Sequence, residues 1–171
     1  MAEHRYVSLI SSLPYHGGSL FAAKQTPLSR IRLMQRLADL DPADHALLMR
    51  IWRLVDWSQY RMDDSVALIT RRVREVVEAL ENPCLRDIVE QRFEIRTLMA
   101  GLRRRHRGET AAPPNRDWGY GRWLDRMARY WREPGFRLER VFPWVLEADR
   151  LLAKGDALGL ERLILRAAWD H

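Results

Sequence analysis

Residues 82–108 read NPCLRDIVEQRFEIRTLMAGLRRRHRG and carry signals for both ends of one helix. Asn82 followed by Pro83 is typical of an N-cap and a first helical position, because proline needs no backbone donor there. Arginines crowd the far end, where the helix dipole favours cations, and Gly108 ends the pattern. The stretch therefore predicts a helix that runs to about His106. Its apolar residues recur at three- to four-residue spacing: Leu85, Ile88, Val89, Phe93, Ile95, Met99 and Leu102.

The same helix-start signals occur earlier in the chain. Thr26-Pro27, Asp41-Pro42 and Asp64-Ser65 each precede a run whose apolar residues follow helical spacing. The run after Ser65 is rich in β-branched residues, but its apolar positions do not alternate, so we expect a helix rather than a strand. Residues 6–13 form the one strand-like piece, which is equally compatible with a short helix.

Residues 108–117 form the clearest linker in the chain. Pro113-Pro114 cannot lie inside a helix, and the segment has little to bury. Beyond this loop, Gly155 is expected to end one helix and Asp156 to cap the next. Three runs with helical spacing follow the loop, at residues 123–131, 138–152 and 156–167. We therefore expect an all-α fold, a helical bundle of about six to seven helices in two hairpin groups.

Length and composition favour one globular domain. The chain has 171 residues and a mass of 20.2 kDa, with 47% hydrophobic and 30% charged residues. A chain of this size buries enough surface to fold without a metal or disulfide, so we expect a single domain over residues 1–171, with a candidate sub-boundary in the 108–117 loop. Trp169 lies close to the C-terminal residue, His171, so it either docks on the core or belongs to a longer natural chain.

A cytoplasmic location is the expectation from cysteine usage and hydropathy. Cys84 is the only cysteine, so no internal disulfide can form, which fits a reducing compartment. No apolar run approaches the ~18 residues that a membrane-spanning helix needs. The N-terminal residues also show no secretory signal.

Metal-binding and nucleophilic motifs are absent from the sequence. None of the five histidines has the close His or Cys partner that a zinc site requires, so we expect no metal and no cofactor. Cys84 lies in the first turn of a predicted helix, where the dipole can lower a thiol pKa, but no Cys-His pattern accompanies it. The histidines are His4, His16, His45, His106 and His171.

Two glutamates could form an acid–base pair. Glu90 and Glu94 are four residues apart and share one helical face. Neighbouring arginines favour a solvated ladder of ion pairs, whereas acid–base chemistry would need a pocket around the carboxylates. An enzyme that uses Glu90, Glu94 or Cys84 is therefore the least supported functional class, and we predict that the protein is not an enzyme.

Positive charge is concentrated in the middle of the chain. The net charge is +6, and residues 83–140 hold 14 basic and 8 acidic side chains, which accounts for the whole excess. The densest run is Arg103-Arg104-Arg105-His106-Arg107, at the end of a predicted helix beside the flexible loop. Such a run either stabilises the helix, because cations are favoured at the negative end of the helix dipole, or forms a surface that binds phosphates, acidic lipids or an acidic protein. We predict that the four arginines, Arg103, Arg104, Arg105 and Arg107, bind an acidic partner and are dispensable for folding.

Aromatic residues alternate with arginines after the loop. Basic residues interleaved with aromatic ones can form a stacking platform for single-stranded nucleic acid. Helical spacing instead places Trp123, Met127, Tyr130 and Trp131 on a face separate from the arginines, so we expect these four side chains in the core.

Two short stretches resemble a known family. Residues 6–14, YVSLISSLP, resemble the opening of a little-characterised bacterial family associated with V-type ATPases. Residues 134–139, PGFRLE, together with Phe142-Pro143-Trp144, resemble the glycine-phenylalanine-x-leucine segment of that family. The family is regarded as a shortened relative of the C-type subunit of V/A-type ATPases, whose eukaryotic counterpart is the d-type subunit. This chain is about half the expected length of that larger protein.

The resemblance implies a mechanical function. In the C-type subunit, stacked helical bundles form a funnel that sits on the membrane rotor ring and couples the ring to the central shaft. By resemblance, this chain is a non-catalytic subunit or accessory protein that contacts the central-stalk and rotor-ring subunits, at the inner face of the membrane through those partners. The alternative function is a nucleic-acid-binding helical module that uses the Arg-rich middle segment.

Overall fold

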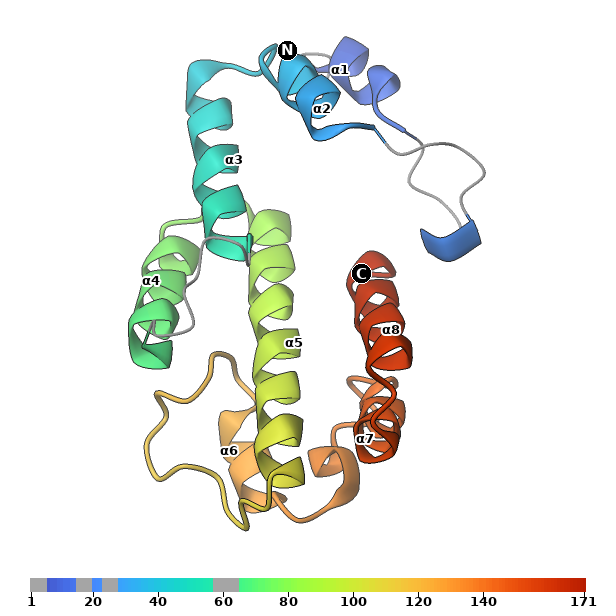
Figure 1. Ribbon diagram of the computed structural model, residues 1–171. Coiled ribbons are helices and arrows are strands. Elements are labelled where there is room, and N and C mark those ends of the chain that lie inside the picture. The colour runs from blue at the N-terminus through green and yellow to red at the C-terminus, as the bar shows by residue number, and fades with distance from the viewer. Residues whose placement is uncertain (1–5, 15–19, 23–27, 57–64) are drawn as a thin grey trace. The chain divides into compact units, whose positions relative to one another are not determined.

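The computed structural model describes residues 6–14, 20–22, 28–56 and 65–171 (Figure 1). Regular structure in these ranges consists of eight α-helices and two short 3₁₀ helices, without a strand. The predicted all-α fold is confirmed, with eight helices in place of the expected six to seven. The additional helix is Val7–Ser12, in the stretch that the sequence left open between strand and helix.

The chain divides into two compact units, Met1–Arg53 and Leu54–His171. The 108–117 loop lies inside the second unit. The first unit contains α1 (Val7–Ser12), the 3₁₀ helix η1 (Leu20–Ala22), α2 (Arg30–Leu37) and most of α3 (Pro42–Val55). The second contains α4 (Val66–Glu78), α5 (Pro83–His106), α6 (Leu124–Arg129), the 3₁₀ helix η3 (Pro134–Arg137), α7 (Val145–Lys154) and α8 (Ala157–Trp169).

Hydrogen bonds hold the start of α1 against the start of α3. The Tyr6 hydroxyl donates to Asp44 Oδ2 at 2.5 Å and accepts from the Asp41 backbone N–H at 3.3 Å. The predicted start of α3 at Asp41-Pro42 is confirmed. The predicted start of α2 is wrong, because residues 28 and 29 are not helical and Ser29 is the N-cap. Thr26-Pro27, the predicted start, lies outside the described residues.

Helix α5 is the central element of the second unit. Helices α7 and α8 pack on α5 and on each other, and α4 packs on α5 separately (Figure 1). Both ends of α5 lie where the sequence predicted, because the signals for them are local. The Asn82 side chain accepts from the backbone N–H groups of Cys84 and Leu85 at 2.9 and 3.2 Å, and Gly108 takes a positive φ after the last turn.

The segment between α6 and α7 departs from the prediction. Helices were expected over 123–131 and 138–152, but α6 ends at Arg129 and α7 begins only at Val145. Between them, Gly135, Phe136 and Arg137 have φ of +55°, +56° and +55°. Left-handed backbone is unfavourable for residues with a side chain, so packing must hold Phe136 and Arg137 in place. The turn lies between the two expected helices, and each helix is shorter on the side that faces the turn than the apolar spacing suggested.

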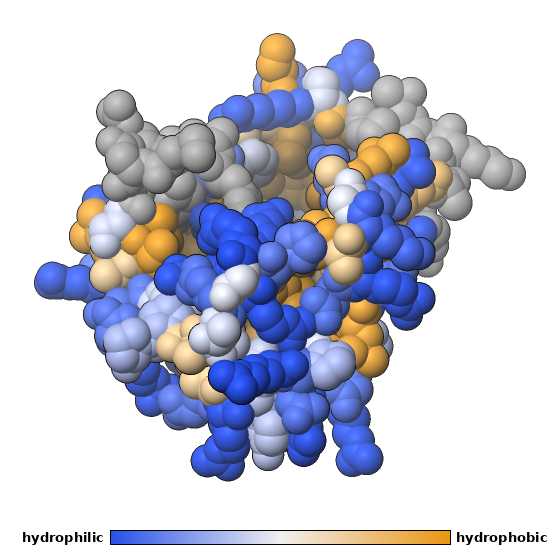
Figure 2. Space-filling model, turned by 60° about the horizontal axis from the view of Figure 1, so that its bottom comes forward, coloured by the Kyte–Doolittle hydropathy of each residue, from blue (hydrophilic) through white to orange (hydrophobic). Residues whose placement is uncertain are grey.

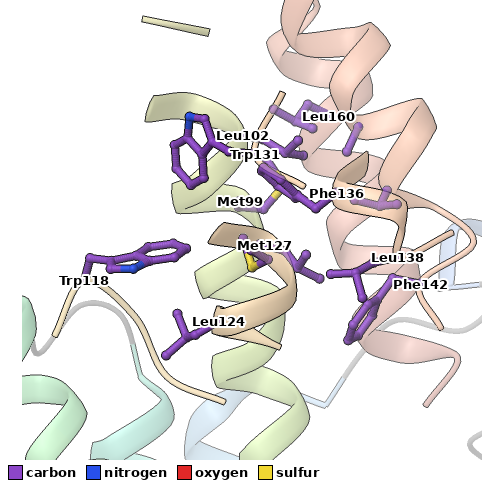
Figure 3. Close-up of a cluster of buried hydrophobic side chains, with 13 residues drawn as sticks. Met99, Leu102, Trp118, Leu124, Met127, Trp131, Phe136, Leu138, Phe142 and Leu160 are labelled. Carbon is purple, nitrogen blue, oxygen red and sulfur yellow. The ribbon is translucent and has the colours of Figure 1, made fainter. Parts of the chain in front are cut away.

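The core of the second unit forms around that turn (Figure 3). The Phe136 ring is fully buried and lies 5.5 Å from the Trp131 ring, which meets Trp118 edge-on at 5.7 Å. Edge-to-face and tilted aromatic pairs add to the free energy of burying apolar area. Met127 and Trp131 are buried as predicted, whereas Trp123 and Tyr130 are only half-buried.

No helix in the described part of the chain is long and apolar enough to cross a lipid bilayer.

Candidate functional site

The predicted arginine cluster divides into two structural classes. Arg103 and Arg107 are exposed, whereas Arg104 and Arg105 are half-buried. Arg105 forms an ion pair with Asp149 at 2.5 Å and donates to the Glu133 carbonyl oxygen at 2.5 Å. Its guanidinium carbon also lies 4.9 Å from the centre of the Phe136 ring. The expectation that all four arginines are exposed is therefore wrong for Arg104 and Arg105. Arg105 joins α5 to α7 and to the left-handed turn.

Arg104 has a local partner. Its Nε lies 2.9 Å from Glu109 Oε2, and the two side chains are 33% and 37% exposed. A pair at this exposure stabilises the fold only slightly. Arg103 and Arg107 form no ion pair with the described residues, so their charges remain free to meet a partner.

Four exposed arginines lie at or just beyond the C-terminal ends of α5 and α6. We call this surface the cationic end and define it as Arg103, Arg107, Arg129 and Arg132. The Arg105 contacts hold residues 131–133 against the last turn of α5, and Arg132 Nε donates to the Thr110 carbonyl oxygen at 3.4 Å. Figure 2 looks onto this end of the second unit and shows a predominantly hydrophilic surface.

The neighbouring tryptophans do not form a stacking platform. Trp118 and Trp131 are 7% and 3% exposed, and the Trp131 indole donates to the Glu109 carbonyl oxygen at 2.7 Å. A ring that stacks on a base must present an open face. These two rings instead close the core beneath the 108–117 loop.

A second feature is a cleft of about 430 Å³ in the second unit. It is formed by α4, α5 and residues 116–124, and sequence reasoning missed it. Its lining residues are Arg74, Glu90, Glu94, Arg116, Tyr120, Gly121, Arg122 and Leu124.

Glu94 is the buried carboxylate of this cleft. Its side chain is only 6% exposed, so the predicted solvated ion-pair ladder is wrong for this residue. Arg122 Nε lies 3.3 Å from Glu94 Oε1, and the Arg122 backbone N–H donates to the same oxygen at 3.4 Å.

The pKa of the Glu94 carboxyl is set by influences that act in opposite directions. Burial raises the pKa of its carboxyl, and the positive charge of Arg122 opposes that increase. The nearby Trp123 indole N–H also lowers the pKa, although it forms no hydrogen bond of regular geometry. The Glu90 carboxylate raises the pKa. The net result is a raised pKa, because removal from water dominates.

The loop that closes the cleft is held tightly against α5. The Thr97 hydroxyl donates to the Tyr120 carbonyl oxygen and accepts from the Tyr120 backbone N–H, both at 2.8 Å. Gly121 has φ of +115°, and a Cβ there would lie 2.6 Å from Glu94 Cγ. Only glycine therefore allows this backbone to approach Glu94.

Tyr120 completes the polar lining. Its hydroxyl donates to Glu90 Oε1 at 3.3 Å, and its ring meets Phe93 edge-on with centres 6.1 Å apart. Burial and the adjacent Glu90 carboxylate raise the pKa of this phenol, so it stays protonated and remains a donor.

The described residues contain no group of three or more His, Cys, Asp or Glu side chains placed to hold a metal ion. Cys84 is exposed in the first turn of α5. His4 and His16 lie outside the described residues.

Comparison with protein family models, curated proteins and solved structures finds no match to this chain.

Proposed function

We propose that this protein is a non-catalytic helical subunit or accessory protein of a rotary V/A-type ATPase, linking the central shaft to the membrane rotor ring. Its cationic end would dock on an acidic surface of a central-stalk or rotor-ring subunit. In this proposal the protein is cytoplasmic and reaches the membrane only through its protein partners. The observation that carries the proposal is the cationic end, where Arg103 and Arg107 have no ion pair within the described residues.

The position of the family-like segment supports the proposal. Phe136 and Leu138, from the stretch that resembles the ATPase-associated family, are 0% and 1% exposed. Gly135 is also buried, and a Cβ there would lie 2.8 Å from Val145 Cγ1. In this stretch the glycine, phenylalanine and leucine of the family-like segment are therefore core residues, whereas most residues of the 6–14 stretch are exposed.

The stiffness of the second unit is a further support. A protein that transmits torque needs a body that does not deform and charged surfaces at which it meets its neighbours. The Arg105–Asp149 ion pair and the packed aromatic rings hold the last turn of α5 to the core of the second unit.

Nucleic acid is the less favoured partner. Trp118 and Trp131 are buried and Arg105 is engaged within the fold, so these two rings and this arginine are not available to a nucleic acid. The exposed arginines alone would still attract phosphates without sequence selectivity. Nucleic-acid binding is therefore an outcome that the following experiment must distinguish.

Co-purification tests the proposal. A tagged chain expressed in its native host should recover identified central-stalk or rotor-ring subunits after nuclease treatment. The variant Arg103→Gln/Arg107→Gln should recover markedly less of them. The matched control Arg71→Gln/Arg72→Gln removes the same charge from an exposed face of α4 and should behave as wild type. Recovery of nucleic acid without any ATPase subunit would contradict the proposal.

A further inference from the structure

We infer that the cleft between α4, α5 and residues 116–124 binds a small zwitterion of the free amino acid class. Its ammonium group would meet the carboxylates of Glu90 and Glu94, and its carboxylate group would meet Arg74 and Arg116. This inference is independent of the proposed ATPase role, because it concerns a different surface of the second unit.

The floor of the cleft holds more negative than positive charge. Glu94 is nearly fully buried, Glu90 is half-buried, and a single cation, Arg122, is paired with the floor. The Arg122 side chain is itself 66% exposed and extends over the Trp123 ring, 5.4 Å from its centre. The two carboxylates of the floor are matched by only one guanidinium, which is itself largely solvated. Negative charge removed from water therefore remains, and a further donor group would stabilise it. An ammonium group supplies three donors in a compact volume.

The rim of the cleft has the opposite character. Arg74 is exposed on α4 and forms no ion pair with the described residues. Among the described residues Arg116 pairs only with Asp125, at 3.3 Å, and these side chains are 62% and 72% exposed. Exposed pairs of this kind contribute little free energy, so a ligand carboxylate can replace Asp125 at small cost. Arginine also matches the planar geometry of a carboxylate.

A ligand with only one charge fits the lining less well. A simple cation would satisfy the floor but would face the rim arginines, and a simple anion would face the floor carboxylates. A molecule that carries both groups satisfies both sets of side chains at once. The volume of about 430 Å³ lies within the range of about 300–1,000 Å³ that small-molecule sites occupy.

The site is also organised before any ligand arrives. Thr97 fixes the Tyr120 backbone through two hydrogen bonds, and Gly121 lets the loop lie directly on Glu94. The Tyr120 hydroxyl holds Glu90 in turn. Side chains held in this way lose little conformational freedom when a ligand binds, which favours affinity.

Isothermal titration calorimetry on the full chain tests the inference. The probes are L-leucine, L-glutamate and L-arginine, which share the zwitterionic group and differ in side chain. The half-ligands n-butylamine and butyrate each carry one of the two charges. We expect at least one amino acid to bind, with both half-ligands weaker by about tenfold or more, as expected when one charged hydrogen-bonding group is lost.

Two variants locate the binding site. Arg74→Gln and Glu94→Gln should each weaken binding of that amino acid by about tenfold or more. Arg72→Gln, an exposed neighbour on α4 outside the cleft, is the matched control and should bind as wild type. Because Arg74 is exposed, its substitution leaves the fold intact even if Glu94→Gln does not fold.

Three results would overturn the inference. They are the failure of all three amino acids to bind wild type, equal binding of either half-ligand, and unchanged affinity in Arg74→Gln.

Discussion

Arg105 shows how one residue in a run of like charges can differ from its neighbours. Arg103 in the last turn of α5 and Arg107, its C-cap residue, are exposed, whereas Arg105 between them is half-buried. There it meets Asp149, the Glu133 carbonyl oxygen and the Phe136 ring. The same residue type in adjacent positions therefore serves the fold at one position and remains available to a partner at two others.

Replacement of Arg105 should destabilise the fold. Arg105→Gln leaves Asp149 and the Glu133 carbonyl oxygen without their donor, in a setting where the Arg105 side chain is 18% exposed. We expect the free energy of unfolding to fall by about 1–3 kcal/mol. Arg103→Gln, the exposed control, should change it by no more than about 0.5 kcal/mol. Urea unfolding of both variants checks this, and equal stability of the two would contradict the structural role of Arg105.

The raised pKa of Glu94 predicts a pH dependence of stability. A carboxyl whose pKa is higher in the folded than in the unfolded chain binds its proton more tightly in the folded state. Its stabilising contribution is complete below the unfolded value, near 4.5, and is lost as pH rises through the raised folded pKa. The free energy of unfolding of wild type, relative to Glu94→Gln, should therefore fall as pH rises above about 4.5.

Chemical unfolding at a series of pH values measures that difference. Glu75→Gln on α4 is the control for loss of one negative charge, since its carboxylate is exposed and pairs with Arg71 at 3.1 Å. A wild-type advantage over Glu94→Gln that grows with rising pH would contradict the burial argument.

At the scale of elements, local signals were sufficient for some helix ends and insufficient for others. Asn82-Pro83 and Gly155-Asp156 cap helices through hydrogen bonds within a few residues, so the sequence alone located them. The turn at Gly135 and Phe136 depends instead on burial of the Phe136 ring beside Trp131, and no local pattern encodes that packing.

The cleft was hidden from the sequence for the same reason. The four-residue spacing of Glu90 and Glu94 is enough to predict that they share a helical face. The residues that bury Glu94, however, come from a loop almost thirty positions later. Gly121 is a local hint, since glycine often occurs where backbone approaches another group closely or takes a positive φ, as it does here. Only the folded chain shows which side chain it approaches.

The aromatic core between α6 and η3 gives an element-scale prediction. Trp131 is 3% exposed, contacts Trp118 and Phe136, and donates to the Glu109 carbonyl oxygen. Trp131→Ala should lower the free energy of unfolding by about 3–5 kcal/mol. Tyr130→Ala, at the adjacent half-buried position, should cost less. Thermal unfolding measures both, and a Trp131→Ala chain that keeps its stability but loses affinity for nucleic acid would favour the nucleic-acid alternative.

At the scale of the whole molecule, the net charge of +6 can be divided between arginines that have partners within the fold and arginines that do not. Some are used inside the second unit, by Asp149, by Glu94 and by backbone carbonyl oxygens. The cationic end carries charge that no described acidic residue neutralises, on a body held together by a packed core. This combination is suited to rapid, oriented association with an acidic protein surface.

The most direct test of that role is the affinity of the purified chain for purified central-stalk and rotor-ring subunits, measured across a salt series. We expect wild type to bind at least one of them, with affinity that falls as salt rises, because salt screens exposed charges. Arg103→Gln/Arg107→Gln should bind more weakly, with the greatest loss at low salt and an unchanged melting curve. If wild type binds none of these subunits, or if the variant binds them as tightly as wild type at every salt concentration, the cationic end is not the docking surface proposed for it.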